Sequence, residues 1–284
     1  MSEIKIHVFH TGKVCVSPEL PFGGEGCSIF KASGVFTKKD KRLWLPVSAY
    51  LIEIDDKLVL FDCGWHRDMS PEGTQGTQAQ IASLGCRLLY NINQGHVPQG
   101  QTIDEQLSTL GISPKDLDVV LLSHLDCDHA NGLKLVKDAK RILVSADELH
   151  FAENNAFINR IRYQQKWWED TRLETFRWNV CVGPANKSYD VFGDGKLLMV
   201  NIPGHSKGQC ALKITNLDGK FVLLFADGGY ASKSWQEMIT SGIADDKQAQ
   251  KNSLQWIREQ SLSPDCIESL ANHDAEVKPH VIEF

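Results

Sequence analysis

Four side chains able to bind a metal ion lie within six residues, in the segment His124-Leu-Asp-Cys-Asp-His129. This segment directly follows the apolar run 117–122, which predicts a buried strand. Alternate residues after a strand can face the same way, so His124, Asp126, Asp128 and His129 can converge. Imidazole and carboxylate groups are ligands of zinc, iron and manganese. The spacing indicates a metal site; the alternative is a solvated loop with two incidental histidines.

The segment resembles the signature of the metallo-β-lactamase superfamily. That signature is His-x-His-x-Asp-His after a strand, then a distant Gly-His, an Asp after a later strand and a final His. Matching residues follow in the same order: His205 in Pro-Gly-His-Ser, Asp227 in Leu-Phe-Ala-Asp and His273 in Ala-Asn-His-Asp. The ordered set extends over most of the chain and is more specific than any single match. It implies an α/β fold, the four-layered αβ/βα sandwich, with a two-metal site between the sheets.

Within this superfamily the sequence is most similar to the N-acyl homoserine lactonases. It opens with His10-Thr-Gly before a long loop, continues with Asp227-Gly-Gly-Tyr230 and closes with His273-Asp274. The resemblance implies a metal-dependent hydrolase that opens a lactone ring through a metal-bridging hydroxide. It also implies two divalent metal ions, zinc by default, with manganese or iron as alternatives.

The same resemblance assigns the site residues. The first ion would be held by His124, Asp126 and His205. The second ion would be held by Asp128, His129 and His273, and Asp227 would bridge both. Tyr230 and Asp128 would be the catalytic residues, and the Tyr230 hydroxyl would hydrogen-bond the substrate carbonyl or the leaving oxygen.

Asp126 departs from the family pattern, which has a histidine at this position. A carboxylate can replace imidazole as a ligand, and an additional oxygen donor shifts the preference toward harder ions such as manganese or iron. The alternative is that Asp126 faces away from the metals and caps the following helix.

Several residues have competing interpretations. Tyr230 is either a hydrogen-bond donor to substrate or a packed aromatic residue, and His205 either a ligand or a turn residue. His280 competes with His273 for the last ligand position, and the Asn-His-Asp context favours His273. We expect Cys127 to point away from the metals into the core rather than to act as a catalytic thiol.

Alternation, apolar runs and capping residues predict the elements that position this site. Strands are expected at 4–9, 49–54, 57–62, 117–122, 141–145, 196–202, 210–215 and 220–226. Helices are expected from capping boxes at Thr102–Glu105 and Ser145–Glu148, and at 247–259. We expect a single domain over residues 1–284, with a loop insertion at about 17–46 and a helical insertion at about 146–180. Aromatic residues in these insertions either line an apolar pocket or pack on the sheets.

Composition limits the partners of the 284-residue chain. The net charge of −6 and the lack of a basic run argue against nucleic acid, and the longest apolar runs are too short to span a membrane. We expect a small-molecule substrate; the oligomeric state is left open. The N-terminus has no apolar signal region, and the eight cysteines form no CxxC pair. We therefore expect reduced, buried thiols and a cytoplasmic location.

Three other functional classes are alternatives to lactone hydrolysis. The nearest is hydrolysis of another ester, a thioester or a phosphodiester on the same dinuclear site. Redox chemistry at a di-iron centre usually needs an appended flavin domain, for which 284 residues leave no room. A binding module with a degraded site is disfavoured by the complete set of ligands.

Overall fold

The computed structural model describes residues 4–70, 76–154 and 156–284. In these ranges the strands form an eight-stranded and a five-stranded sheet. The order along the first sheet is β13 (His280–Glu283), β1 (Lys5–Val16), β2 (Leu43–Ile54), β3 (Lys57–Phe61), β5 (Val119–Leu121), β6 (Ile142–Ser145) and β7 (Leu173–Phe176), with β4 (Gln94–His96) paired to β1. The order along the second sheet is β12 (Cys266–Ala271), β11 (Phe221–Ala226), β10 (Cys210–Thr215), β9 (Leu197–Asn201) and β8 (Ser188–Asp190).

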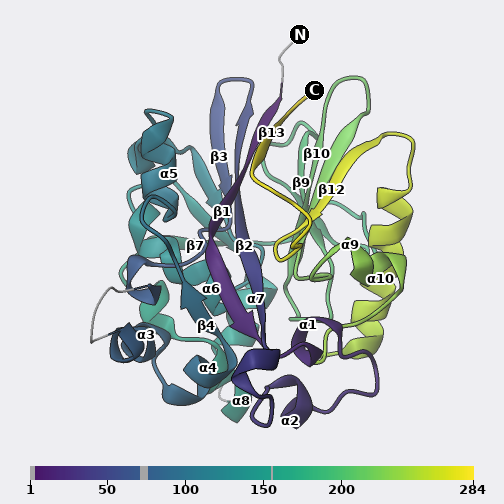
Figure 1. The fold of residues 1–284 in the computed structure, drawn as a ribbon. Coiled ribbons are helices and arrows are strands. Elements are labelled where there is room, and N and C mark those ends of the chain that lie inside the picture. The colour runs from purple at the N-terminus through teal and green to yellow at the C-terminus, as the bar shows by residue number, and fades with distance from the viewer. Residues whose placement is uncertain (1–3, 71–75, 155) are drawn as a thin grey trace.

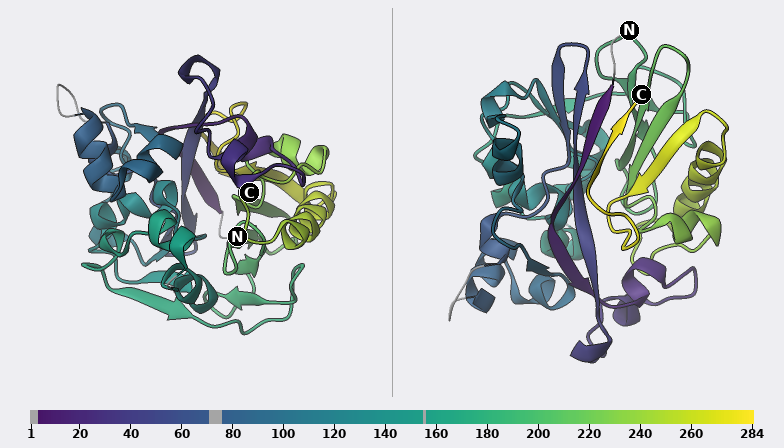
Figure 2. Two further views of the ribbon diagram at one scale, coloured as in Figure 1. Left: turned by 90° about the horizontal axis from the view of Figure 1, so that it is seen from below. Right: turned by 45° about the horizontal axis from the view of Figure 1, so that its top comes forward.

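Helices lie on the outer face of each sheet (Figures 1 and 2). The α-helices are α1 (Glu19–Phe22), α2 (Ile29–Ala32), α3 (Gly76–Leu84), α4 (Arg87–Ile92), α5 (Ile103–Thr109), α6 (Cys127–Ala130), α7 (Ala146–Ala152), α8 (Phe157–Arg162), α9 (Ser232–Gln236) and α10 (Lys247–Ser261). Short 3₁₀ helices are η1 (Lys39–Lys41), η2 (Arg67–Met69), η3 (Pro114–Asp116), η4 (Asn131–Val136) and η5 (Gln165–Trp167). No helix among the described residues is long and apolar enough to cross a membrane.

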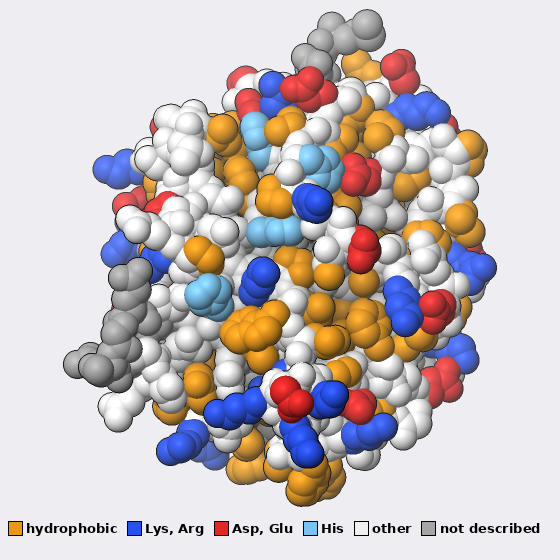
Figure 3. All heavy atoms as spheres, viewed as in Figure 1, with side chains coloured by type: hydrophobic (Ala, Val, Ile, Leu, Met, Phe, Trp, Pro, Cys, Tyr) orange, Lys and Arg blue, Asp and Glu red, His pale blue; other side chains and the backbone are white. Residues whose placement is uncertain are grey.

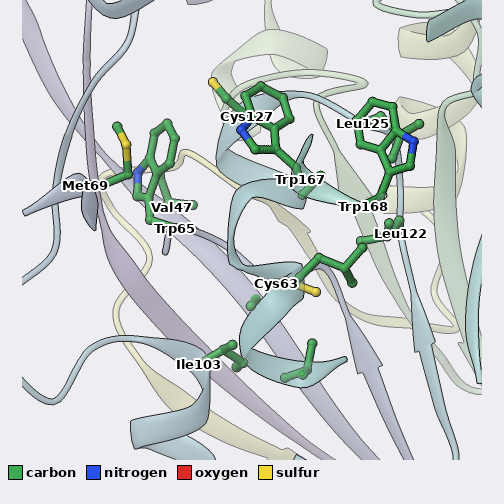
Figure 4. Packing of buried hydrophobic residues seen from close by; sticks show 14 of the residues in the cluster. Val47, Cys63, Trp65, Met69, Ile103, Leu122, Leu125, Cys127, Trp167 and Trp168 are labelled. Atoms are coloured by element: carbon green, nitrogen blue, oxygen red, sulfur yellow. The ribbon is translucent and has the colours of Figure 1, made fainter. Parts of the chain in front are cut away.

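Three hydrophobic clusters fill the spaces between neighbouring layers. One lies between the first sheet and its helices and contains Trp65, Trp167 and Trp168, which Figure 4 shows from close by. A second joins the inner faces of the two sheets, and a third packs the second sheet against α10 through Leu254 and Ile257. Alternation of side chains along each strand supplies apolar groups to both faces. The four-layered αβ/βα sandwich predicted from the sequence is thereby confirmed.

Most predicted elements are present, with shifted ends. The hairpin β2–β3 turns at Asp55-Asp56, where Asp55 adopts a φ of 52°. The capping box at Thr102 opens α5, and Gly111 follows it at a φ of 73°. The strand predicted at 4–9 continues to Val16. Pairing with β2 and β4 extends it, across an irregularity between His10 and Lys13.

Both insertions differ from the prediction. The segment 17–46 is not simply irregular: it contains α1, α2 and η1, and β2 already begins at Leu43. The segment 146–180 is not helical throughout, because β7 pairs in parallel with β6 and ends the helical part. Sheet pairing is a long-range interaction, which the local pattern does not reveal. The single domain over 1–284 remains a prediction, and the residues read for a signal segment lie partly outside the described ranges.

Candidate metal centre

The predicted ligands all follow strands and meet between the two sheets. On the first sheet, the loop after β5 carries His124 and leads into α6. On the second sheet, β9, β11 and β12 each lead to one further ligand. These are, in order, His205, Asp227 and His273. Strand ends that converge on one edge fix these side chains without long flexible connections.

One half of the cluster combines Asp128, His129 and His273, which each offer a ligand atom within 4.8 Å of the others. We call it the second half. The His273 Nε2 atom lies 3.4 Å from Asp128 Oδ2 and 3.2 Å from Asp227 Oδ1. The His129 Nε2 atom lies 3.3 Å from the same Asp227 oxygen. These distances suit donor atoms that surround one ion.

The other half, called the first half, combines His124, Asp126 and His205. The Asp126 Oδ2 atom lies 2.8 Å from His205 Nε2 and 3.4 Å from His124 Nε2. The second oxygen of Asp227, Oδ2, lies 3.6 Å from His205 Nε2 and 4.0 Å from His124 Nε2. Asp227 therefore turns one oxygen toward each half, as a bridging ligand does.

Unpartnered polar atoms show that the cluster suits cations. The Nε2 atoms of His124, His129 and His273 and Oδ1 of Asp227 are buried and have no hydrogen-bond partner among the described residues. Buried polar atoms in folded proteins are nearly always paired. Nitrogen and carboxylate donors that converge without partners fit divalent metal ions.

Asp126 faces the histidines rather than the helix that follows it. It occupies the N-cap position of α6, but its side chain makes no capping hydrogen bond. Its carboxylate instead contacts His124, His205 and Arg162. The Asp126 side chain therefore does not cap the helix. It lies beside His124 and His205, in a position that suits a ligand.

Arg162, at the end of α8, was not predicted. Its Nε and Nη2 atoms lie 2.5 and 2.7 Å from the two Asp126 oxygens, and Nη2 also lies 2.8 Å from His205 Nε2. Burial raises the pKa of Asp126, but Arg162 and the hydrogen bonds from His124 and His205 together hold that pKa well below its ordinary value. Burial raises the pKa of Asp128, which lacks such a partner. The two carboxylates thus lie in different electrostatic environments.

Further groups orient the ligands. Asp62 is fully buried and accepts hydrogen bonds from His129 Nδ1 at 2.8 Å and from the Ser123 amide and hydroxyl. The Nδ1 atom of His273 lies 2.8 Å from the carbonyl oxygen of Pro46. Such contacts fix each ring so that its Nε2 atom faces the centre of the cluster. Asp62 directly follows an apolar strand, as Asp227 does, and this shared signal was available in the sequence.

The capping box predicted at Ser145–Glu148 is only half formed, because the Glu148 carboxylate binds elsewhere. Ser145 caps α7 by accepting from the Glu148 amide, but the Glu148 carboxylate does not reach back to Ser145. It accepts instead from the Leu125 amide, the Ser206 hydroxyl and the Gly208 amide. This buried carboxylate ties the loop of His124 to the loop of His205. The tertiary partners override the local capping pattern.

An apolar cavity of about 400 Å³ ends at the cluster. Its polar end includes Asp126, Asp128, Asp227 and Tyr230, with Arg162 and His205 beside them. Its walls come from both insertions and from α4. The wall residues include Ile29, Phe30, Val35, Leu88, Phe157, Ile158 and Ile161. Figure 3 shows hydrophobic side chains at the surface on the lower part of this face, where α1 and α2 lie.

Tyr230 and Cys127 both line this cavity. The Tyr230 ring stacks on His273 at a centroid distance of 5.1 Å. Burial, then Asp227, raises the pKa of Tyr230 well above its ordinary value, so the hydroxyl stays protonated. Cys127 packs in the core, as predicted, and belongs to none of the ligand groups among the described residues, although it also lines the cavity. Burial, then Asp128, raises the pKa of this thiol well above its ordinary value and opposes a nucleophilic role.

Residues outside the cluster include the competing His280 and the cysteines. His280 lies on β13 beside Glu268, away from the seven ligands, so the structure brings His273 and not His280 to the site. All eight cysteines are free, but only Cys15, Cys63, Cys127 and Cys210 are buried. The expectation of buried thiols therefore holds for half of them.

The fold and the donor set define an αβ/βα sandwich protein with a buried cluster of groups that could hold metal ions. The family model of the metallo-beta-lactamase superfamily matches residues 42–223, and the chain belongs to this superfamily.

One similar protein with a named activity matches about half of the chain, and another matches most of it. The N-acyl homoserine lactonase AttM of Rhizobium radiobacter is 30% identical over 139 residues, which are 49% of this chain and 51% of that protein. The chain thus spans about half the length of this relative. The N-acyl homoserine lactonase AiiB of Agrobacterium fabrum is 26% identical over 248 residues, 84% of this chain and 83% of that protein.

A solved structure supports the fold. It is an N-acyl homoserine lactone hydrolase with the product N-hexanoyl-L-homoserine bound at its catalytic metal centre. It superimposes with a TM-score of 0.73 at 20% identity, over 97% of this chain and 95% of that chain.

Proposed function

We propose that the chain is a metal-dependent hydrolase that opens the ring of a lactone of the N-acyl homoserine lactone type. One observation carries the proposal: unpartnered histidine nitrogens converge, around a carboxylate that faces both halves, at the polar end of an apolar cavity. The named activity of AttM and AiiB supports the choice of a lactone among the carbonyl substrates that such a centre can take.

The centre would hold two divalent ions. The proposed ligands are His124, Asp126 and His205 in the first half and Asp128, His129 and His273 in the second half. Asp227, which faces both halves, would be shared between the two ions. When bound, divalent ions supply Lewis acidity, which lowers the pKa of bound water and polarises a carbonyl oxygen. Zinc is the default, and manganese or iron are the alternatives because three carboxylates contribute oxygen donors.

The chain's own groups would position the substrate. The buried, protonated Tyr230 hydroxyl can donate a hydrogen bond to the lactone carbonyl or to the leaving oxygen. Asp128, at the cavity end and 3.4 Å from His273 Nε2, would help to orient the second half. Asp62 and Pro46 hold the histidine rings so that they do not reorient during turnover.

The cavity suits an acyl chain. Its walls are mostly aliphatic or aromatic, and its charged groups are gathered at one end, at the ligand cluster. Binding sites for small amphipathic molecules have this distribution. A lactone with an apolar tail would place its ring at the metal centre and its tail between α2, α4 and α8.

A small molecule is therefore the proposed partner, with neither nucleic acid nor a membrane required. The net charge of −6 argues against nucleic acid as a partner. The cytoplasmic location remains a prediction.

The test is metal analysis of the purified protein beside turnover of a panel of lactones, thioesters and phosphodiesters. We expect two divalent ions per chain and the highest kcat/KM for N-acyl homoserine lactones. Preference for a thioester or phosphodiester would reject the lactone and keep the hydrolase. Near-zero metal content after growth and purification with zinc or manganese would reject the metal centre.

A further inference from the structure

We propose that Arg162 is a resident cation that competes with the first ion for Asp126 and His205, so that the chain binds its two ions with unequal affinity. The second half would fill first. The inference rests on the proposed two-ion centre and concerns how that centre is loaded.

The guanidinium contacts the atoms that the first ion would need. Its Nε and Nη2 atoms lie 2.5 and 2.7 Å from the two Asp126 oxygens, which is a bidentate pair. Nη2 also lies 2.8 Å from Nε2 of His205. Two of the three proposed ligands of the first half therefore already face a positive charge. An ion can bind them only if the guanidinium gives up part of these contacts.

Arg162 is held in place from several sides. Its side chain is only 13% exposed, and its Nη1 atom donates to the carbonyl oxygen of His205 at 3.0 Å. Its guanidinium carbon lies 5.0 Å from the centre of the Tyr163 ring. Removing a buried cation from its partners is costly because the charge is already out of water. The arginine is thus a fixed part of the first half and not a mobile surface group.

Among the described residues, no arginine or lysine contacts the ligands of the second half. The Nε2 atoms of His129 and His273 have no hydrogen-bond partner among the described residues, and Asp128 contacts histidines but no arginine or lysine. With the histidines counted as neutral and the shared Asp227 left out, the first half has the charges of Asp126 and Arg162, one negative and one positive. The second half has the two negative charges of Asp128 and of Asp62, which contacts His129. A divalent ion is therefore attracted more strongly to the second half.

A simpler role for Arg162 is to dock α8 by neutralising a buried Asp126. The two roles differ in one measurable property. A docking residue affects folding stability but leaves the relative affinity of the two ions unchanged. A competing cation sets that difference, and removing the positive charge raises the affinity of the first half alone.

The experiment is a calorimetric titration of the metal-stripped full chain with zinc, repeated with manganese. We expect two steps that differ by about tenfold or more in Kd. In Arg162→Gln, which keeps a polar side chain without the charge, the weaker step should tighten by about tenfold and the stronger step should stay unchanged. Arg160→Gln, an exposed arginine on the same helix, is the matched control and should retain the gap. Asp126→Ala should remove the weaker step only.

Two equal steps in the parent chain, or an unchanged gap in a folded Arg162→Gln, would overturn the inference. A second measurement needs no variant and covers the case in which Arg162→Gln does not fold. Histidine ring nitrogens are followed by NMR while one equivalent of zinc is added. We expect His129 and His273 to respond before His124 and His205, and the reverse order would overturn the inference.

These readouts are independent of the substrate. Unequal steps without lactone turnover would reject the proposed substrate and keep the role of Arg162. Lactone turnover with two equal binding steps would keep the proposed substrate and reject the role of Arg162.

Discussion

The two halves of the metal centre contain similar side chains but depend on different parts of the molecule. The second half is supported by the sandwich itself, through Asp62 beneath His129 and the Pro46 carbonyl beneath His273. The first half is supported from outside, by Arg162 on α8 and by Glu148 on α7. One ion would therefore depend on the sheets, and the other on a peripheral helix.

The largest effect is expected from His273→Ala. Loss of this ligand should empty the second half and lower kcat/KM by about a thousandfold or more, because a bound ion stabilises the transition state by several kcal/mol. Metal content should fall from two ions to one, measured by elemental analysis. A variant that keeps both metal content and activity would reject the second half as assigned. His124→Ala should remove the other ion, and the ratio of the two losses measures the asymmetry directly.

Tyr230→Phe should lower kcat by about a hundredfold, because it removes one hydrogen-bond donor to the reacting oxygens. The ring that stacks on His273 and lies 6.0 Å from the His205 ring is retained. Both halves should therefore keep their ions, and metal analysis of the variant provides the control. Unchanged turnover on every accepted substrate would assign Tyr230 to packing.

Asp126→Asn should weaken the first half by about tenfold or more in metal Kd, since an amide is a much poorer ligand than a carboxylate. The second half should be unaffected, and titration with zinc and manganese measures both. Asp128→Asn is the matched change in the other half and should show the reverse pattern. Equal binding of both ions by Asp126→Asn would mean that Asp126 is not a ligand. In Asp126→His, which restores the family signature, the preference should shift toward zinc.

The smallest effect is expected from Ile158→Ser on α8, which removes an apolar cavity wall residue that is 53% exposed. KM for long-chain lactones should rise by roughly threefold to tenfold, because less apolar surface is buried on binding. Short-chain lactones and metal affinity should change little, which would separate the cavity face of α8 from its Arg162 end. Ile267→Ser, an exposed isoleucine on β12 outside the cavity, is the control. Equal changes for short and long chains would place the acyl tail elsewhere.

The sequence was most informative where ligands directly follow strong apolar strands. His124, Asp227 and the hairpin of β2 and β3 could be predicted because strand patterns and ordered motifs are local properties. Arg162 could not, since its only signal is the unusual Asp126, whose buried charge needs a partner. β7 was missed because its pairing with β6 is a tertiary contact.

Glu148 is a residue whose local sequence pattern predicts the wrong hydrogen-bond partner. Its position after Ser145 fits a capping box, yet its carboxylate serves two distant loops. Local rules describe which contacts are available, and the assembled fold decides which of them are made.

The placement of α8 affects how this protein can change. Arg162 contacts two of the seven proposed ligands, Asp126 and His205. Most apolar residues of the cavity wall lie on other elements, so mutations there would leave these two contacts in place. Helix α8 is the exception, because Phe157, Ile158 and Ile161 line the cavity and Arg162 reaches the ligands. A mutation that shifts this helix to admit a different tail also moves a charge beside the first ion. A change in α8 would therefore alter both the range of substrates and the affinity for the first ion.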